Sequence, residues 1–413
     1  MEPIVYLTCE IKGRDLDSRA LIAAHLVKRG YTALLGQYWN LKDSAPTAPR
    51  GCYLFKTANQ IQADGMSACK MYGHDVVASD EESLSASEAV AAELTVPATF
   101  DYCDLYLALT PAHERAVHKA IPASKGRVRV TGTARADILR ATRFDRPHAA
   151  PYVLFNTSFG WLNSVWGSVI HAINNYSRGS QRDLETPEDQ ALIRSRVDYE
   201  TAALRETRAL LDWFIARADM DIILRPHPNE NVSWWRKHYG RAGRLHIVEN
   251  TDPYPWTQHA ALLIHSDSTT GVEATVMGVP CLNLSPHDAW ARRLILRDIN
   301  YSVAAAGEAF GAIESFLDRG EGPIAEARSN DPFPRDCAAA SAAAIASLLP
   351  PPRPMTAFPW ALTPRTDIHK KKFTVSADEF AESLGRALKM AGCEDYAIEP
   401  LVDSVVKVRP RTA

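Results

Sequence analysis

The 413-residue chain lacks the marks of several protein classes. No apolar run approaches the roughly 20 residues of a membrane span, and the N-terminus lacks the basic segment of a signal peptide. The cysteines are odd in number and scattered, with no Cys-x-x-Cys pair. We therefore expect a cytoplasmic protein with reduced thiols, and neither a zinc centre nor a disulfide framework built on cysteine.

Signals for two common kinds of ligand are also missing. The chain has no Gly-x-Gly-x-x-Gly, so a dinucleotide-binding fingerprint is not supported. The formal net charge of −3 argues against binding of bulk nucleic acid or of an anionic membrane, though a local basic cleft stays compatible with it. Lys370, Lys371 and Lys372 could contact anionic headgroups, but a plain solvated run is the simpler interpretation.

What is present is an alternation of short apolar runs and helical segments in a chain long enough for two domains. Strands are expected at Ile4–Cys9, 32–35, Cys52–Phe55, 75–78, 105–109 and 127–131, and helices at 20–28, 84–94 and 134–139. After residue 151 the pattern restarts, with strands at 152–155, 222–224, 245–248, 261–264 and Cys281–Leu284 and a long helix at 192–216. This alternation is typical of doubly wound, Rossmann-like α/β domains.

The breaks in this pattern suggest domain limits. The polar, proline-containing stretch 143–151 is interpreted as a hinge, 174–189 as a long loop, and 350–354 as a stiff proline-rich linker. We expect an N-terminal domain at 1–146 and a C-terminal domain at 151–349, closed by the Ala-rich segment 337–349. A tail at 350–413 would contain the amphipathic helix Ala377–Ala391. Two Rossmann-like units facing a cleft, with a helical extension, form the GT-B architecture.

Two strands of the second domain end abruptly in residues that can bind an anion. The strand at 222–224 runs into Arg225-Pro-His227-Pro, and the strand at 261–264 runs into four hydroxyls where a helix should begin: Ser266, Ser268, Thr269 and Thr270. Ligands of open α/β sheets bind at the carboxyl ends of the strands, and helix N-termini bind phosphate. These segments therefore predict a nucleotide-phosphate site, although one hydroxyl could be a plain helix N-cap and His227 a plain turn residue.

Further residues of the second domain are candidates at the same edge. Asn156, at the end of the 152–155 strand, is expected on the donor side of the site. Glu230 and Asp267 lie near the expected phosphate and could act as a nucleophile in a double displacement, with Glu230 otherwise an exposed residue at a helix start. His265 is either a buried strand-end histidine or an acid near the leaving group.

Carboxylates also follow strands of the first domain. Asp80 and Glu81 are candidate general bases for an acceptor hydroxyl, and their bland interpretation is a solvated helix start. Glu10, Arg14 and Asp15 follow the first strand and are expected to contact substrate. Asp15 and Asp17 form an Asp-x-Asp pattern that some transferases use for a metal, but the helix-rich layout argues against that use, so no metal is expected.

Arg-Pro-His-Pro at 225–228 and Ser-x-Ser-x-x-Gly-x-Glu-Ala at 266–274 resemble paired motifs of bacterial GT-B enzymes that use CMP-activated sugars: sialyltransferases, polysialyltransferases and capsule Kdo transferases. Residues 10–16, 80–82 and 130–139 are similar to bacterial surface-carbohydrate biosynthesis proteins. The family most resembled is the retaining β-Kdo transferase module of O-antigen and capsule assembly, over about residues 4–290. In that family pattern an acidic pair precedes Gly, whereas Glu82 here precedes Ser83.

The resemblance implies a glycosyltransferase that moves an acidic sugar, with Kdo as the leading candidate, from a CMP-sugar to a glycan or lipid-linked acceptor in envelope polysaccharide assembly. It implies that Glu273 binds the ribose hydroxyls, although an acid in a first helical turn is also favoured by the helix dipole. No cofactor beyond the donor is expected, and peripheral membrane association stays open. The alternatives are a CDP-glycerol or UDP-sugar transferase, or a catalytically silent glycan-assembly partner. Acceptor, linkage and stereochemical outcome are left open.

Overall fold

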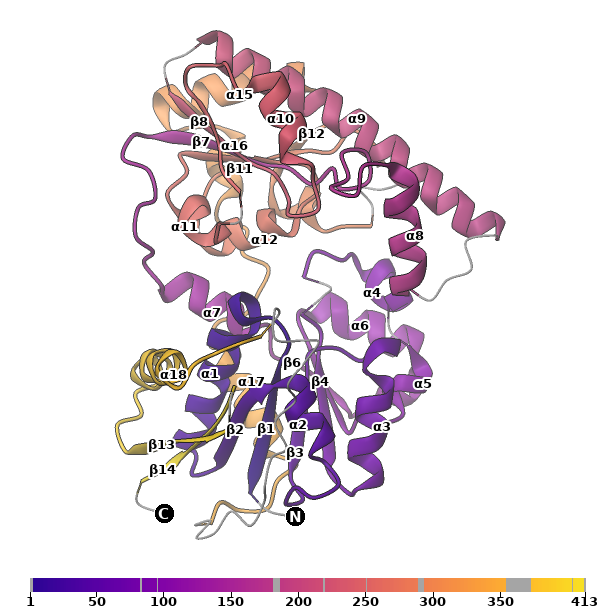
Figure 1. The fold of residues 1–413 in the computed structure, drawn as a ribbon, viewed down its shortest axis with the longest axis vertical. Coiled ribbons are helices and arrows are strands. Elements are labelled where there is room, and N and C mark those ends of the chain that lie inside the picture. Colours follow the sequence, from indigo (N-terminus) through magenta and orange to yellow (C-terminus); the bar gives the residue numbers. More distant parts are fainter. Residues whose placement is uncertain are drawn as a thin grey trace. The chain divides into compact units, whose positions relative to one another are not determined.

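The computed structural model describes residues 3–81, 84–94, 96–180, 186–217, 220–249, 251–288, 293–353, 373–402 and 404–411. The chain forms two compact units (Figure 1). Unit 1 consists of Met1–Leu84, Glu88–Ala141 and Phe333–Ala413, and unit 2 of Ser85–Ser87 and Thr142–Pro332. Glu82 and the lysines at 370–372, which the sequence analysis singled out, lie outside the described residues.

Unit 1 is built on an eight-stranded sheet of order β13-β14-β2-β1-β3-β4-β5-β6. The six strands from β2 to β6 are parallel, whereas β14 pairs antiparallel with both β2 and β13. The bounds are β1 (Ile4–Cys9), β2 (Thr32–Gln37), β3 (Cys52–Phe55), β4 (Asp75–Ser79), β5 (Leu105–Ala108), β6 (Val128–Val130), β13 (Tyr396–Val402) and β14 (Val405–Pro410).

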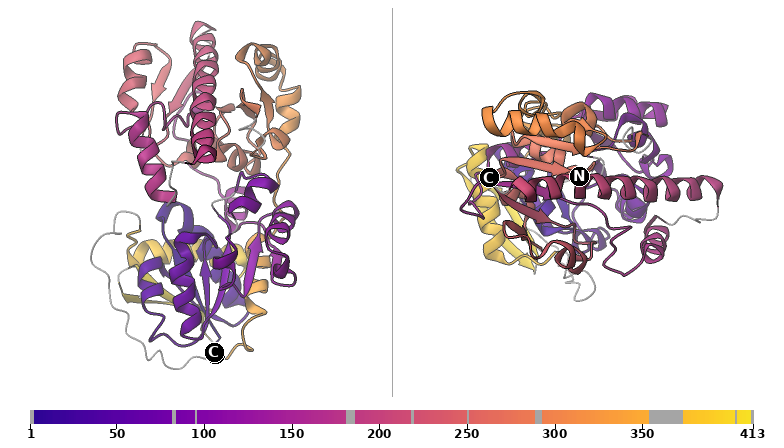
Figure 2. Two further views of the ribbon diagram at one scale, coloured as in Figure 1. Left: turned by 90° about the vertical axis from the view of Figure 1, so that its right-hand side faces the viewer. Right: turned by 90° about the horizontal axis from the view of Figure 1, so that it is seen from above.

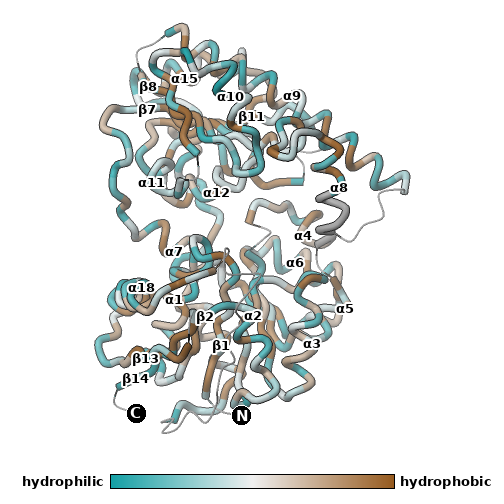
Figure 3. Tube along the Cα trace, in the orientation of Figure 1, coloured by the Kyte–Doolittle hydropathy of each residue, from teal (hydrophilic) through white to brown (hydrophobic). Residues whose placement is uncertain are grey.

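Helices cover both faces of this sheet. On one face the apolar sides of four helices form a core with β1, β2 and β3: α1 (Lys12–Lys28), α7 (Ala134–Ala141), α17 (Cys337–Ala346) and α18 (Ala377–Ala391). The other face is covered by α2 (Tyr38–Asp43), α3 (Ala63–Met71), α5 (Pro97–Phe100) and α6 (Pro111–Ala120). The central strands β1, β2 and β3 are buried on both faces, as is typical of parallel sheets, and β1 and β2 are largely hydrophobic in Figure 3.

Unit 2 is built on a six-stranded parallel sheet of order β12-β11-β10-β7-β8-β9. Its strands are β7 (Tyr152–Asn156), β8 (Asp221–Arg225), β9 (Leu245–Ile247), β10 (Leu262–His265), β11 (Cys281–Leu284) and β12 (Tyr301–Val303). One face is covered by α9 (Pro187–Arg217), α10 (Val232–Tyr239), α15 (Ala306–Arg319) and α16 (Pro323–Ala327), and the other by α11 (Pro253–Gln258) and α12 (Thr269–Val276). Helix α9 is seen side-on in both views of Figure 2.

These sheets confirm the predicted fold class, since two Rossmann-like units each carry six parallel strands between helices. Every strand expected from an apolar run is present, with ends shifted by no more than two residues. Among the described residues, no helix is both long enough and apolar enough to cross a membrane.

The third segment of the chain differs from the expectation. Helix α17 was expected to close the second domain, but it packs against α1 and α7 in unit 1. Its Ala338, Ala342 and Ile345 form an apolar stripe, whose small residues let the helix lie close to α1. The tail is also more than helical, because β13 and β14 extend the unit 1 sheet beside β2. Gly36 of β2 permits this contact, since a Cβ there would lie 2.7 Å from the carbonyl oxygen of Ser404.

Two other segments also differ. The stretch 143–151, expected as a hinge, belongs to unit 2 and is fastened there: Phe144 N–H donates to the side chain of Gln258 at 2.8 Å, and His259 hydrogen-bonds the Phe144 carbonyl. The chain changes units just before it, after Ala141. Helix α8 (Val169–Ser180) occupies part of the expected loop at 174–189, of which 181–185 lie outside the described residues.

Candidate functional site

The carboxyl ends of neighbouring strands in unit 2 form a row of polar side chains. The strand register places Arg225 of β8 beside Asn156 of β7, Asn156 beside His265 of β10, and His265 beside Asn283 of β11. Parallel strands bring these ends to one edge of the sheet, where ligands of such folds bind. The sequence motifs at 225–228 and 266–274 therefore lie at one edge, on either side of Asn156.

Several buried polar atoms at this edge have no hydrogen-bond partner among the described residues. They are Asn156 Oδ1, Arg225 Nε and Thr251 Oγ1. Arg225 is held from its other end, where Nη2 donates to the Thr251 carbonyl at 2.7 Å, and burial lowers the pKa of its guanidinium. Buried polar groups are normally paired. The unpaired donor Arg225 Nε therefore favours an anionic group at this edge, and the unpaired acceptor Asn156 Oδ1 favours a ligand that also carries a hydrogen-bond donor such as a hydroxyl.

The side chain of Glu230 holds the Arg-Pro-His-Pro turn in place through hydrogen bonds. This residue was expected to be exposed, but it is 2% exposed and its carboxylate accepts three hydrogen bonds: from Thr157 Oγ1 at 2.7 Å, from His227 N–H at 3.0 Å and from Trp235 Nε1 at 2.9 Å. Burial raises the pKa of Glu230, and these donors oppose the shift. The expectation of exposure is wrong, because the side chain turns inward to satisfy three buried donors. The placement favours an anchoring role over nucleophilic attack.

His227 is left with one ring nitrogen for a ligand. Its Nδ1 accepts a hydrogen bond from Asn229 N–H at 3.1 Å, so in the neutral ring the proton lies on Nε2. Loss of water and the guanidiniums of Arg225 and Arg196 hold the pKa of His227 below its ordinary value. The imidazole is therefore a neutral Nε2–H donor near pH 7.

His227 lines a pocket of about 420 Å³ within unit 2. Arg196 of α9 lies in the pocket wall, and its Nε donates to the fully buried Glu200 at 2.9 Å. The same carboxylate accepts the backbone N–H groups of Trp161 and Leu162, both at 3.1 Å, and so shapes the loop after β7. The pocket lining combines hydroxyl, amide, cationic and indole groups: Ser158, Gly160, Trp161, Trp166, Ala172, Arg196, His227 and Asn229. This composition suits a phosphate or a sugar.

The four hydroxyls after β10 do not act alike. Ser268 is the N-cap of α12 and accepts the N–H of Thr270, while Thr269 is exposed at the helix start. Ser266 instead turns to α9, where its Oγ lies 3.3 Å from that of Thr207. The geometry thus brings Ser268, Thr269 and Thr270 to the helix N-terminus, where an anion is stabilised, and removes Ser266 from that group.

His265 and Asp267, which were considered as an acid and a nucleophile, are engaged by the protein. His265 accepts Ser268 N–H at Nδ1 and contacts Asn300 Oδ1 through Nε2 at 3.0 Å, so it is the Nε2–H tautomer. Burial lowers its pKa to about 4. Asp267, at φ +45°, accepts hydrogen bonds from Asn283 and Ser285. The placement favours structural roles for both.

Glycine at position 271 is required by this arrangement. A Cβ at Gly271 would lie 2.3 Å from His265 Nε2 and 2.6 Å from Asn300 Oδ1. Helix α12 therefore approaches β10 closely only because position 271 has no side chain. Two residues further along the helix, Glu273 is 8% exposed and accepts a hydrogen bond from Tyr254 at 3.2 Å. Its binding of ribose stays a prediction.

In unit 1, Asp80 and Glu81 point to opposite sides of the end of β4. Both are buried, which differs from the bland interpretation of a solvated helix start. Glu81 Oε1 accepts a hydrogen bond from Arg19 at 2.8 Å, and Arg19 is fully buried. Asp80 Oδ2 lies 3.3 Å from the Tyr106 hydroxyl and 3.6 Å from Nε2 of His113. Each carboxylate therefore has fixed neighbours, and Glu81 Oε2 has no hydrogen bond among the described residues.

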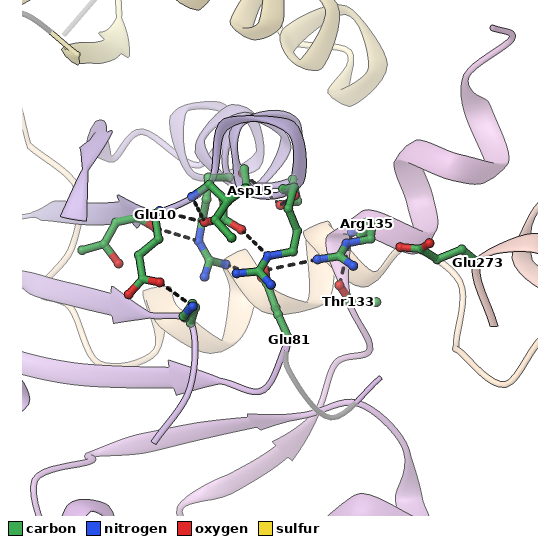
Figure 4. Close-up of polar contacts among 12 residues, drawn as sticks. Glu10, Asp15, Glu81, Thr133, Arg135 and Glu273 are labelled. Atoms are coloured by element: carbon green, nitrogen blue, oxygen red, sulfur yellow. Dashed lines mark hydrogen bonds and ion pairs between the residues drawn. The ribbon is translucent and has the colours of Figure 1, made fainter. Parts of the chain in front are cut away.

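Glu10 and Asp15 lie beside Glu81 (Figure 4), and Arg14 contacts Asp15. Asp15 Oδ2 accepts the N–H groups of Glu10 and Ile11 at 2.7 and 2.9 Å, and Arg14 Nε donates to its Oδ1 at 3.1 Å. Burial alone would raise the pKa of Asp15, but Arg14 and the backbone donors hold it below its ordinary value. The carboxylate of Glu10 is paired with Lys56 and accepts Gln62 Nε2.

Asp15 and Asp17, the Asp-x-Asp pattern, have separate partners. Asp15 closes the loop between β1 and α1, whereas Asp17 accepts hydrogen bonds from Ser383 and Arg386 of α18. Residues two positions apart on a helix point to different sides, so the two carboxylates do not converge. The pattern has a structural explanation in each case.

The structure adds residues that sequence reasoning missed. Arg19 and Arg135 carry guanidiniums to Glu81, with Arg135 Nη2 at 4.0 Å from Glu81 Oε2. Arg196 reaches the unit 2 pocket from the middle of α9. Arg19 and Arg135 lie in helices far along the sequence from Glu81, whereas Arg196 pairs with Glu200 four residues on, and nothing in the local pattern distinguishes any of the three from a solvated helical arginine. Trp161 and Trp166 had a signal, because they follow the polar end of β7.

No protein-family model and no curated protein matches the chain. Among solved structures, UDP-GlcNAc 2-epimerase of Methanocaldococcus jannaschii in complex with UDP-GlcNAc and UDP has a TM-score of 0.51 at 11% identity, covering 84% of this chain and 100% of that one. The S. aureus MnaA–UDP structure gives 0.49 at 11%, covering 81% and 93%. Anabaena Alr3699/HepE with UDP-glucose gives 0.47 at 13%, covering 84% and 100%. At these identities the M. jannaschii structure shows a shared GT-B-like fold, and the other two carry no further argument.

Proposed function

We propose that this protein is an enzyme that binds a nucleotide sugar through unit 2 and acts in carbohydrate assembly. The observation that carries the proposal is the carboxyl edge of the unit 2 sheet. Asn156 Oδ1 and Arg225 Nε lie there buried and unpaired, between the neutral imidazole of His227 and the N-terminus of α12. A nucleotide sugar suits this set, because its phosphate accepts hydrogen bonds from a guanidinium, an imidazole N–H and helix N-terminal groups, while its hydroxyls can donate to Asn156 Oδ1.

The finer proposal is transfer of an acidic sugar, with Kdo as the leading candidate, from its CMP derivative to a glycan acceptor. It rests on the resemblance of segments 225–228 and 266–274 to motifs of CMP-sugar transferases.

In this proposal the carboxylates of unit 1 supply the base for the acceptor hydroxyl. Glu81 suits that role better than Asp80, because Arg19 holds only its Oε1 while Oε2 makes no hydrogen bond within the described residues. Asp80 has Tyr106 and His113 as neighbours. His227 would donate Nε2–H to the leaving phosphate as negative charge develops there.

A UDP-sugar enzyme is the second candidate. The structure with the same fold from M. jannaschii contains UDP-GlcNAc and UDP. The polar groups at the strand ends would serve either nucleotide, because they address the phosphate and leave the base unspecified. In this alternative Glu273 would still be near the ribose, and only base recognition would differ.

The two candidates are separated by binding of the nucleotides themselves. Thermal-shift and calorimetric titrations with CMP, CDP, UDP and GDP should show one preferred nucleotide, which stabilises the folded protein by mass action. Preference for CMP supports the transferase for an acidic sugar, and preference for UDP supports the alternative. Absence of binding by all four, with the fold intact, would reject the nucleotide site. Incubation of the preferred nucleotide sugar with and without acceptor glycans then distinguishes a transferase from a silent binding partner.

A further inference from the structure

Three potential metal ligands meet at the opposite, amino-terminal edge of the unit 2 sheet. His148 lies in the segment that enters β7, Asp221 is the first residue of β8, and His246 lies on β9. Strand β8 pairs with both β7 and β9, so the topology brings the three together from positions far apart in the sequence. One ligand atom from each lies within 4.8 Å of the other two.

The distances describe a hydrogen-bonded pair with a third group beside it. Nε2 of His148 is 2.7 Å from Asp221 Oδ2, and Nε2 of His246 is 3.9 Å from the same oxygen. The two imidazole centroids are 5.2 Å apart. The side chain of His148 is 23% exposed, that of Asp221 20% and that of His246 47%. The cluster is therefore preformed, reachable from solvent, and free to adjust at His246.

We propose that His148, Asp221 and His246 form a binding site for a divalent transition metal of the Zn²⁺ type. Two imidazoles and one carboxylate are a common donor set for Zn²⁺, with water in the fourth position. Bonds of roughly 2.0–2.2 Å in tetrahedral geometry place ligand atoms roughly 3.3 Å from one another. Side-chain movements on the order of 1 Å would bring the observed atoms to that spacing. The hydrogen bond from His148 lowers the pKa of Asp221, so its carboxylate is available as an anion.

The proposed metal site would stabilise the fold of unit 2 and would take no part in nucleotide binding at the opposite edge of the sheet. Asp221 and Arg225 are the first and last residues of β8, roughly 13 Å apart at about 3.3 Å per residue. A metal at Asp221 would fasten the segment 142–151, which enters unit 2 from unit 1, to strands β8 and β9. The inference is therefore independent of the proposed nucleotide site.

The alternative is a His148–Asp221 hydrogen bond with His246 nearby by chance, and His246 distinguishes the two. Without metal, the half-exposed His246 at 3.9 Å adds little, so His246→Ala should leave the melting temperature of the metal-free protein unchanged. With metal, it is one of three protein ligands. The matched control is His238→Ala, which removes another exposed histidine of unit 2.

The experiment uses the full chain after treatment with chelator and dialysis. Calorimetric titration with ZnCl₂ should show one site per chain. Binding should be at least tenfold weaker in His246→Ala and in Asp221→Asn but not in His238→Ala. A thermal scan with ZnCl₂ present should show a raised melting temperature. CoCl₂ should give visible d–d absorption that is lost in the same two variants. Absence of a stoichiometric site, or equal affinity in His246→Ala and His238→Ala, would overturn the proposal. Nucleotide binding by metal-free His246→Ala should match that of the wild type.

Discussion

The carboxylate of Glu230 accepts a hydrogen bond from the indole N–H of Trp235 at 2.9 Å, and Trp235 is fully buried. This hydrogen bond joins the turn after β8 to α10. The other carboxylate oxygen of Glu230 accepts the backbone N–H of His227 and so fixes that part of the turn. Glu230 thus belongs to the support of the site. A carboxylate that must accept three hydrogen bonds is poorly placed to attack an anomeric carbon, because attack would break them.

Glu230→Gln should lower the stability of unit 2. The amide has one acceptor oxygen, so its NH₂ group would face at least one of the donors that the carboxylate now accepts, and leaving a buried donor unpaired costs about 1–3 kcal/mol. Urea unfolding followed by tryptophan fluorescence measures this, since most tryptophans lie in unit 2. Glu249→Gln, at a half-exposed position where the carboxylate pairs with Arg236, is the control. A Glu230→Gln protein of unchanged stability that forms no product would instead indicate a nucleophile, to be tested by trapping a sugar–enzyme adduct.

His227→Ala should weaken binding of the preferred nucleotide while the fold survives. The residue lies at the surface of a pocket, and among the described residues its ring makes a local hydrogen bond, to Asn229 N–H. A hydrogen bond to a charged phosphate is worth about 1.5–3 kcal/mol, so the dissociation constant should rise roughly 10- to 150-fold. Calorimetric titration measures it, with His238→Ala as control. Unchanged affinity and unchanged turnover in His227→Ala would remove this residue from the site.

Arg225→Met should separate stability from binding. Arg225 Nε is buried without a partner, whereas Nη2 donates to the Thr251 carbonyl, so removal of the guanidinium relieves one cost and creates another. The melting temperature of the ligand-free protein should therefore change little, while nucleotide affinity falls at least tenfold. Arg236→Met, which removes an exposed arginine of the same unit, should change neither. Loss of stability without loss of affinity would show that Arg225 serves the fold alone.

The parts of the fold that could be predicted are those written in local patterns. Buried parallel strands are continuous apolar runs, so β1, β7 and β10 were recognisable, and polar residues directly after β8 and β10 marked the ligand edge. The unit to which α17 belongs could not be predicted, because an Ala-rich helix fits many apolar faces. Only its tertiary contact with α1 places it in unit 1. The hairpin of β13 and β14 was overlooked in the same way, at the far end of the chain from its partner β2.

The candidate site shows the same division. The sequence predicted Arg225, His227 and Asn156 as candidates because they end or closely follow strands, and the structure places Arg225 and Asn156 side by side at one edge of the sheet. It did not distinguish Ser266 from Ser268, because two residues of difference turn one hydroxyl to α9 and make the other an N-cap. Exposure was misjudged for Glu230, since its partners Thr157 and Trp235 lie on other elements. Side-chain pairing over long sequence separations decides such cases, and periodicity does not encode it.

Glu81→Gln should destabilise unit 1 through Arg19. The two form a buried ion pair at 2.8 Å, and removing one charge leaves the fully buried guanidinium uncompensated, at a cost of up to about 3–5 kcal/mol. The double variant Arg19→Met/Glu81→Leu should recover part of the loss, which a double-mutant cycle of unfolding free energies measures. If Glu81→Gln is instead as stable as the wild type, binds nucleotide normally and transfers no sugar, the carboxylate acts in the transition state as a base.

The unfolding free energy of unit 2 should decrease as the pH is lowered, because of His265. Its pKa is about 4 in the folded protein, where burial disfavours the charged ring, against about 6.5 in an unfolded chain. Between these values the unfolded state binds more protons, so the stabilisation is fully present above about pH 6.5 and is lost as pH falls toward 4. Urea unfolding at several pH values gives the slope of the unfolding free energy against pH. In His265→Gln this slope should be smaller than in the wild type by up to about 1.4 kcal/mol per pH unit, which corresponds to one proton. His238→Gln, which replaces an exposed histidine of the same unit, is the control. Equal slopes in His265→Gln and the wild type would mean that the ring is already protonated in the folded protein, and the assigned Nε2–H tautomer would then be wrong.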